Sequence, residues 1–100
     1  MALQISEARG VFSVFGELNS NNVTILRRHM SNYIKRDQRV ILNLERVKKL
    51  DVNAAFTLKN LFMEAIGKSS IFSIVALENK NVMDVFKETQ IAHIVSNDRY

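Results

Sequence analysis

Residues 40–67 read VILNLERVKKLDVNAAFTLKNLFMEAIG, and this stretch decides the fold of the chain. It opens with a nearly continuous apolar run over residues 40–44, which predicts a short strand covered on both faces. Asp51 or Asn53 is suited to cap a helix, apolar residues then recur at helical spacing, and Gly67 ends the pattern. A buried strand followed by an amphipathic helix is typical of an α/β fold.

The two faces of this predicted helix differ in composition. At about 100° per residue, the apolar face spans roughly 140° and predicts core residues. They are Ala54, Ala55, Leu58, Leu61, Phe62, Ala65 and Ile66. Phe56 and Met63 lie on the opposite side together with Lys59 and Asn60. An aromatic ring and a flexible thioether on the solvent side favour a contact with a partner or a second copy. Contact with another part of the domain and simple exposure remain the alternatives.

The residues ahead of this unit predict a hairpin and a helix. Leu3–Ile5 and Val11–Phe15 are short runs of β-branched and aromatic residues, and Arg9-Gly10 between them favours an antiparallel hairpin. The next apolar residues share one face at helical spacing, and this pattern stops near Arg36-Asp37. They are Val23, Leu26, Met30, Tyr33 and Ile34.

The residues after Gly67 continue the alternation of strands and helices. Residues 71–77 predict a buried strand, residues 79–89 predict a helix, and residues 92–95 predict a last strand or turn. The order ββαβαβα predicts one α/β domain over residues 1–100, a mixed sheet with parallel central strands packed against helices. The expected core includes Ile41, Leu58, Leu61, Phe62, Ile74, Val82, Val85 and Phe86.

Composition restricts the class of protein. The chain has 100 residues, 47% of them apolar, which is enough for one core. It has no cysteine, so disulfides, thiolate zinc sites and cysteine nucleophiles are excluded. No apolar run approaches about 18 residues and no signal-peptide pattern opens the sequence. We therefore expect a cytoplasmic protein without membrane insertion.

The net charge of +4 is unevenly placed along the chain. Between Arg27 and Lys49 lie eight basic residues against Asp37 and Glu45, a local excess of six. A solvated basic face, a surface for acidic lipid and a nucleic-acid surface all fit this excess. Only Tyr33 interleaves with the charges, whereas single-strand binders use several stacking aromatics, so we expect no nucleic-acid partner.

Candidate catalytic and ligand-binding motifs fail on spacing. Gly67-Lys68-Ser69 resembles the end of a phosphate-binding loop, but Phe62 stands where that motif needs glycine. His29 and His93 lack neighbouring ligands at metal spacing. Asp51 is better suited to capping a helix than to acid–base work. The sequence therefore predicts a protein that is not an enzyme and has no metal or cofactor.

Several segments resemble one family over nearly the whole chain. Gly16-Glu17-Leu18-Asn19 resembles the Gly-Glu-Leu-Asp turn of STAS domains, the module named for sulphate transporters and anti-sigma factor antagonists. Residues 40–44 are similar to the strand before the signature loop of that family. Leu50-Asp51-Val52-Asn53-Ala54 stands where the family typically carries Asp-Ser-Ser-Gly, and residues 85–91 resemble its closing helix.

The resemblance implies a mechanism and one departure from it. In antagonists of this family, the residue after the loop aspartate is a serine that a partner kinase phosphorylates, and the unphosphorylated form binds that kinase. Here the residue is Val52, which has no hydroxyl, and Asn53 and Ala54 replace the next serine and glycine. Gln90 stands where glycine is common. A binding surface without the usual phosphate switch is therefore expected.

The resemblance thus implies a bacterial regulatory module for signalling and transcription regulation, which binds an anti-sigma factor, a kinase-like protein or a scaffold protein. The alternative is a STAS-like subunit of a membrane lipid or anion transport assembly, whose basic residues would lie near acidic headgroups. The expected partner-binding residues are Glu17, Asn19, Asp51, Val52, Asn53, Ala54, Phe56, Lys59 and Met63.

Overall fold

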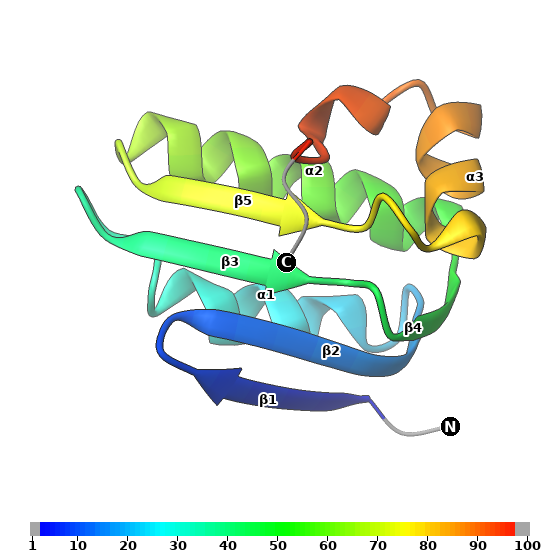
Figure 1. Cartoon of the computed structure of the whole chain (residues 1–100), viewed down its shortest axis with the longest axis horizontal. Coiled ribbons are helices and arrows are strands. Elements are labelled where there is room, and N and C mark those ends of the chain that lie inside the picture. Colours follow the sequence, from blue (N-terminus) through cyan, green and yellow to red (C-terminus); the bar gives the residue numbers. More distant parts are fainter. Residues whose placement is uncertain (1–2, 98–100) are drawn as a thin grey trace.

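The computed structural model describes residues 3–97, which form a mixed sheet with three α-helices (Figure 1). The elements in chain order are β1 (Gln4–Ala8), β2 (Val11–Leu18), α1 (Val23–Ser31), β3 (Arg39–Asn43), β4 (Val47–Leu50), α2 (Val52–Gly67), β5 (Ile71–Val75), α3 (Lys80–Glu88) and the 3-10 helix η1 (Ala92–Ile94). The predicted fold class, α/β with a mixed sheet, is confirmed.

The sheet combines one antiparallel pair with parallel crossovers. Its main order is β1-β2-β3-β5, and β4 pairs with the carboxyl end of β2. β1 and β2 form the predicted hairpin, in which Arg9 and Gly10 both have positive φ, as a type I′ turn requires. β2, β3 and β5 run parallel, with Phe12 beside Leu42 and Leu42 beside Ile74. The central strands are therefore parallel, as the alternation of elements predicted.

One face of the sheet carries the core. α1 and α2 lie on the same side of the sheet and pack against each other, while α3 lies beside β4 and the start of α2 (Figure 1). Alternate strand residues such as Phe12, Leu42 and Ile74 point toward the helices and are buried. Phe86 of α3 and Leu58 of α2 complete the same cluster.

The other face of the sheet is more open than the sequence indicated. The prediction that residues 40–44 are covered on both faces is wrong, because burial along β3 alternates. Val40 and Leu42 are buried, whereas Ile41 and Asn43 are only half-buried. Ile41 was expected in the core. Its side chain points away from the layer of α1 and α2, so these helices do not bury it.

β4 was not predicted. Only its end residues, Val47 and Leu50, are buried, and Lys48 and Lys49 between them are exposed. This strand pairs with β2 across a register shift between Gly16 and Glu17. Two adjacent lysines in a four-residue strand remove the apolar run by which a strand is found in sequence.

Two helix boundaries differ from the prediction. α1 ends at Ser31 rather than near Arg36, so Tyr33 lies beyond the helix and is exposed, although its ring contacts Phe12. α2 includes Gly67, and the left-handed residue that follows it is Ser69, with φ of 56°. The chain turns after α2 at Ser69, not at the glycine.

The last two elements, α3 and η1, lie where the sequence predicted a helix and a final strand or turn. Asn79 caps α3 by accepting from the Val82 backbone N–H, and its amide donates to the Leu44 and Val47 carbonyl oxygens at 2.9 and 2.8 Å. One residue therefore fixes both α3 and the β3–β4 loop. The predicted last strand or turn is η1, followed by a single bridge between Val95 and Ile74.

Candidate functional site

Asp51 joins three segments at the start of α2. One carboxylate oxygen accepts from the Ala54 backbone N–H at 2.8 Å, which is the predicted helix cap. The other oxygen accepts from the Ser20 backbone N–H at 3.0 Å, across 31 residues of sequence. The Asp51 backbone N–H donates to the Leu18 carbonyl oxygen at 3.0 Å. The Asp51 carboxylate thus ties the β2–α1 loop to α2 and shapes the surface around it.

The β2–α1 loop is held by its own asparagines. The Asn19 side-chain oxygen accepts from the backbone N–H of Asn21 and of Asn22, at 2.9 and 3.2 Å. The Asn22 side-chain oxygen accepts from the Asn19 backbone N–H, and its amide donates to the Glu17 carbonyl oxygen. Asn19 therefore supports the loop, while Ser20 and Asn21 are exposed and Ser20 contacts Asp51. Sequence reasoning missed Ser20 because no pattern links it to Asp51.

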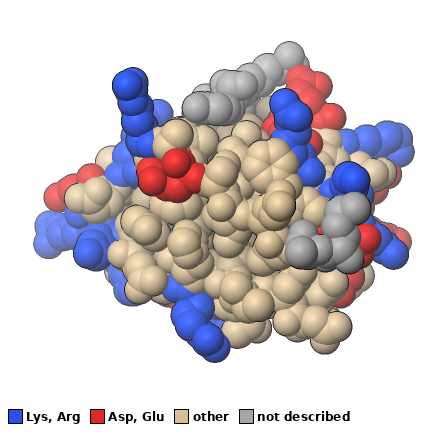
Figure 2. All heavy atoms as spheres, turned by 90° about the horizontal axis from the view of Figure 1, so that it is seen from below, with Lys and Arg blue, Asp and Glu red and all other residues tan. Residues whose placement is uncertain are grey.

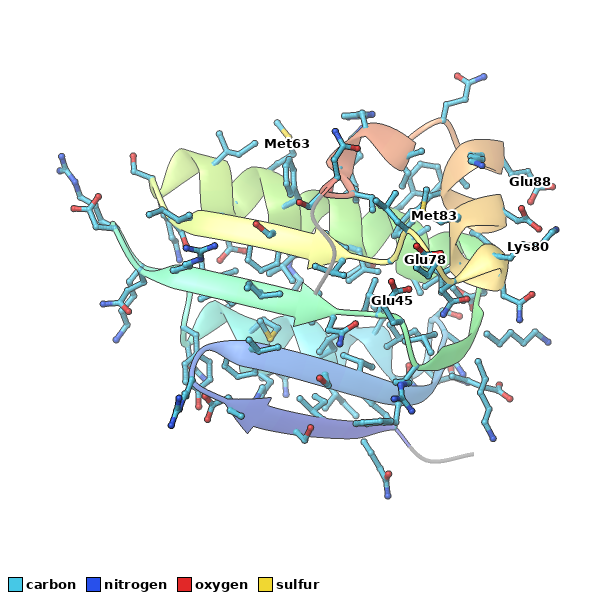
Figure 3. All side chains as sticks on the ribbon, viewed as in Figure 1. Glu45, Met63, Glu78, Lys80, Met83 and Glu88 are labelled. Atoms are coloured by element: carbon cyan, nitrogen blue, oxygen red, sulfur yellow. The ribbon has the colours of Figure 1, made fainter. Side chains whose placement is uncertain are left out.

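We define the outer stripe as Val52, Phe56, Lys59, Met63 and Ile66. At 3.6 residues per turn these residues fall within an arc of about 80° and extend along about 21 Å of helix. The apolar side chains Val52, Phe56, Met63 and Ile66 are 46%, 43%, 53% and 56% exposed. Figure 3 shows Met63 projecting from α2 away from the sheet. One side of α2 therefore carries a row of unpartnered apolar groups among the described residues.

The placement of α2 confirms most of the predicted faces and corrects three residues. Phe56 and Met63 lie opposite the core, as predicted. Ile66 was expected in the core but is exposed, because it lies at the edge of the apolar arc near the end of the helix. Phe62 is half-buried, with its ring 6.4 Å from that of Phe72. Ala54 is fully buried, so its side chain belongs to the core and not to a partner surface.

Two further predicted site residues lie outside the stripe. Asn53 is exposed in the first turn of α2, and Glu17 is half-buried on β2, whereas Lys59 within the stripe is half-buried. Glu64 lies on the flank of α2 that faces α1, where its carboxylate is 3.7 Å from Arg27 and 3.2 Å from Lys68. On α3, outside this site, the pKa of Lys80 is raised by the hydrogen bond that its ammonium donates to the Asp84 carboxylate and by the charge of that carboxylate. The surface of the stripe is thus mainly apolar, and Lys59 is its one charged residue.

The basic segment does not form one surface. Lys35, Arg36 and Arg39 lie before β3 or at its amino end, whereas Lys48 and Lys49 lie on β4, past its carboxyl end. The strand between them separates the two groups, so the sequence excess of six charges is divided in space. Each group is exposed, which favours solvated positions over a single anionic-ligand site.

Neither a metal-ligand cluster nor a membrane-spanning helix is found among the described residues. Residues 3–97 contain no group of three or more His, Cys, Asp or Glu side chains placed to hold a metal ion. In the same range, no helix is both long enough and apolar enough to cross a bilayer.

The fold and the site define a class: a small α/β module with a mixed sheet, two helices on one face and a capped second helix whose outer side is apolar. The family model of the STAS domain matches residues 1–99, and the chain belongs to this family. A comparison with curated proteins gives no match.

Solved structures share this fold. The anti-sigma factor antagonist SpoIIAA in its unphosphorylated form is 19% identical, with a TM-score of 0.71 over 98% of this chain and 89% of that one. An anti-sigma factor antagonist from Mycobacterium paratuberculosis is 18% identical, with a TM-score of 0.63 over 89% and 80%. The SulP transporter STAS domain from Vibrio cholerae is 18% identical, with a TM-score of 0.57 over 91% and 72%.

Replacing Asp51 with alanine should destabilise the domain by about 0.5 to 2 kcal/mol, because α2 loses its cap and Ser20 loses its acceptor. Urea denaturation followed by circular dichroism measures this change. Asp51→Asn, which keeps an accepting oxygen, is the matched control and should lose less. Equal losses in the two variants would contradict the capping role.

Proposed function

We propose that this protein is a non-catalytic regulatory module that binds a protein partner through the outer stripe of α2 and the adjoining Asp51 loop. The observation that carries the proposal is the row of exposed apolar side chains, Val52, Phe56, Met63 and Ile66, on one side of a rigid helix. Apolar and aromatic groups grouped in this way gain free energy when a partner removes them from water. The partner expected from the relatives is an anti-sigma factor, a kinase-like protein or a scaffold protein of a bacterial cytoplasm.

The geometry supports docking against a preformed surface. The start of the stripe is fixed by the Asp51 cap, and the neighbouring Ser20 is fixed by the same carboxylate. A surface held in place before binding loses little conformational entropy when it binds. Hydrogen–deuterium exchange of the complex with a co-purified partner tests this. Slower exchange is expected in residues 52–60 and 19–22, and unchanged exchange there would count against the proposal.

The alternative function is that of a subunit in a membrane transport assembly, with the basic side chains near acidic headgroups. The SulP transporter domain shares the fold, but the basic residues here are divided between two ends of β3. Because the basic residues do not form one surface that could face a membrane, we favour protein binding. Sedimentation with phosphatidylserine vesicles distinguishes the two: salt-sensitive co-sedimentation would favour the transport assembly.

We further propose that binding is not switched by phosphorylation at the start of α2. Val52 occupies the first helical position and offers no hydroxyl, and Asp51 and Asn53 beside it offer none either. Thr57 is the one hydroxyl residue between Leu50 and Thr57, and its oxygen donates to the Asn53 carbonyl oxygen at 3.1 Å. A phosphate at this helix start would add about −1.5 to −2 charges beside Asp51.

Intact-mass analysis of the protein from its native cell should therefore show no phosphate in the peptide that spans residues 50–57. Val52→Ser creates an acceptor and is the informative comparison in the presence of cell extract. A stoichiometric phosphate on the wild-type peptide would contradict the proposal of a switch-free surface.

A further inference from the structure

β1 is an open edge of the sheet. It pairs with β2 on one side, and among residues 3–97 no other strand pairs with its outer side. The opposite edge differs, because Val95 bridges to Ile74 and the Ser96 backbone N–H donates to the Ile74 carbonyl oxygen at 2.7 Å. Residues 3–97 thus cover part of one edge of the sheet and place no strand on the outer side of β1.

The hairpin fixes which backbone groups face outward from β1. Its two-residue turn makes Ala8 and Val11 a hydrogen-bonded pair, so Ser6 and Gln4 also bond toward β2. The backbone N–H and C=O groups of Ile5 and Glu7 therefore point away from β2. These groups are the ones a further strand would bond.

This edge lacks most of the features that usually prevent strand pairing. β1 has the sequence QISEA, with no lysine and no proline, and its register with β2 runs without a bulge. Natural edge strands are blocked by such features, because an unprotected edge is a template for another strand. Glu7 carries the one charge of the strand, and its carboxylate accepts from the Gly10 backbone N–H at 3.0 Å.

The helix layer beside this edge exposes apolar groups, with Arg28 as the charged residue next to them. On α1, Arg27 faces α2, whereas Ile25 and His29 lie on the flank toward β1. The His29 ring lies 5.9 Å from that of Phe12 and 5.6 Å from that of Tyr33, and Ile25 and Tyr33 are 59% and 43% exposed. Figure 2 shows the molecule from this side, with uncharged residues across the centre and most Lys and Arg at the periphery. An apolar centre with a charged rim is the anatomy of a protein interface.

We propose that a second copy of this chain pairs antiparallel with β1, about a two-fold axis at Ile5, so that one sheet runs through both copies. The occupant is a second copy because the edge is complementary to itself. A two-fold axis at Ile5 places Ile5 against Ile5 of the second copy and Leu3 against its Glu7, with the two carboxylates far apart. An axis at Glu7 would oppose two carboxylates, which is unfavourable.

The axis at Ile5 also places the two α1 helices on the same face of the joined sheet, with their exposed flanks toward each other. Ile5 pairs with Val14, which lies two strand residues beyond Phe12, or about 6.6 Å. Ile25 precedes His29 by four residues, or about 6 Å of helix, and His29 lies at the level of Phe12. Ile25 therefore lies close to the level of the axis. This surface is separate from the outer stripe of α2.

Analytical ultracentrifugation of the full chain tests the proposal, with a concentration-dependent rise toward twice the chain mass expected for the wild type. Ile5→Lys should weaken self-association by about tenfold or more, because it buries an unpaired charge at the axis. Ile71→Lys is the matched control, the same change at a 54% exposed residue on the opposite edge strand, and should associate like the wild type. A monomeric wild type, or equal association of the two variants, would overturn the proposal.

Disulfide trapping tests the register without relying on a destabilising variant, because the chain has no native cysteine. In the proposed register Gln4 faces Ser6 of the second copy as a non-hydrogen-bonded pair, with Cα atoms about 4.5 Å apart, which suits a disulfide. A mixture of Gln4→Cys and Ser6→Cys chains should therefore form the crossed disulfide in excess of either homodimer. A statistical mixture of the three products would contradict this register.

Discussion

Replacing Phe86 with alanine should lower the free energy of unfolding by about 3 to 5 kcal/mol, the largest loss we expect from a single truncation in this chain. Phe86 is fully buried on α3 and belongs to the cluster that joins α3 to the sheet and α2. Removing the ring takes away its burial and leaves a cavity. Urea denaturation, with the midpoint and slope compared between variants, measures the change.

Phe62→Ala is the matched control for this measurement, since it removes the same ring from a half-buried position. The sequence pattern placed Phe62 in the core, but the structure places it at the border of α2 and β5, in edge contact with Phe72. The loss at Phe62 should therefore be clearly smaller, about 2 kcal/mol or less. A loss at Phe62 equal to that at Phe86 would show that the two rings are packed alike and would contradict the described burial.

The second large effect concerns the outer stripe. Phe56→Asp and Met63→Asp should each abolish capture of the partner from native extract, while the melting temperature stays within a few degrees of the wild type. Both side chains are exposed, so the folded domain tolerates a charge there. A partner that covers these residues does not, because the carboxylate would be desolvated without a counter-charge.

Ile71→Asp controls for the loss of an exposed apolar residue in general. Ile71 is 54% exposed, close to the exposure of Met63, but it lies on β5 and outside the stripe. This variant should capture the partner as the wild type does. If all three variants lose the partner, the effect is one of surface charge and the stripe is not the docking site.

Much of the fold was predictable because its signals are local. The apolar run at residues 40–44, the capping Asp51 and the helical spacing after it each depend on neighbouring residues. β4 was not predictable, because two of its four residues are exposed lysines and its pairing with β2 brings together residues about 30 positions apart. Ile41 was misplaced because periodicity cannot show which face of a sheet lacks a covering layer.

The candidate site was predictable in part, because some of its signals are also local. The opposite faces of α2 follow from residue spacing, and Phe56 and Met63 were placed correctly. Ile66 was misplaced because the end of a helix can extend past the layer it packs on. Ser20 was missed because its bond to Asp51 spans 31 residues, and only the folded chain brings the two together.

Docking of a protein partner on the outer stripe of α2 can be measured by site-specific photo-crosslinking in the native cell. A photoreactive phenylalanine analogue is placed at position 56, at position 63 and, as the control, at position 71, and the products are identified by mass spectrometry. We expect a cross-link to one and the same protein from positions 56 and 63 and none to that protein from position 71. The absence of a product at both stripe positions, or the same product at position 71, would contradict docking on the stripe.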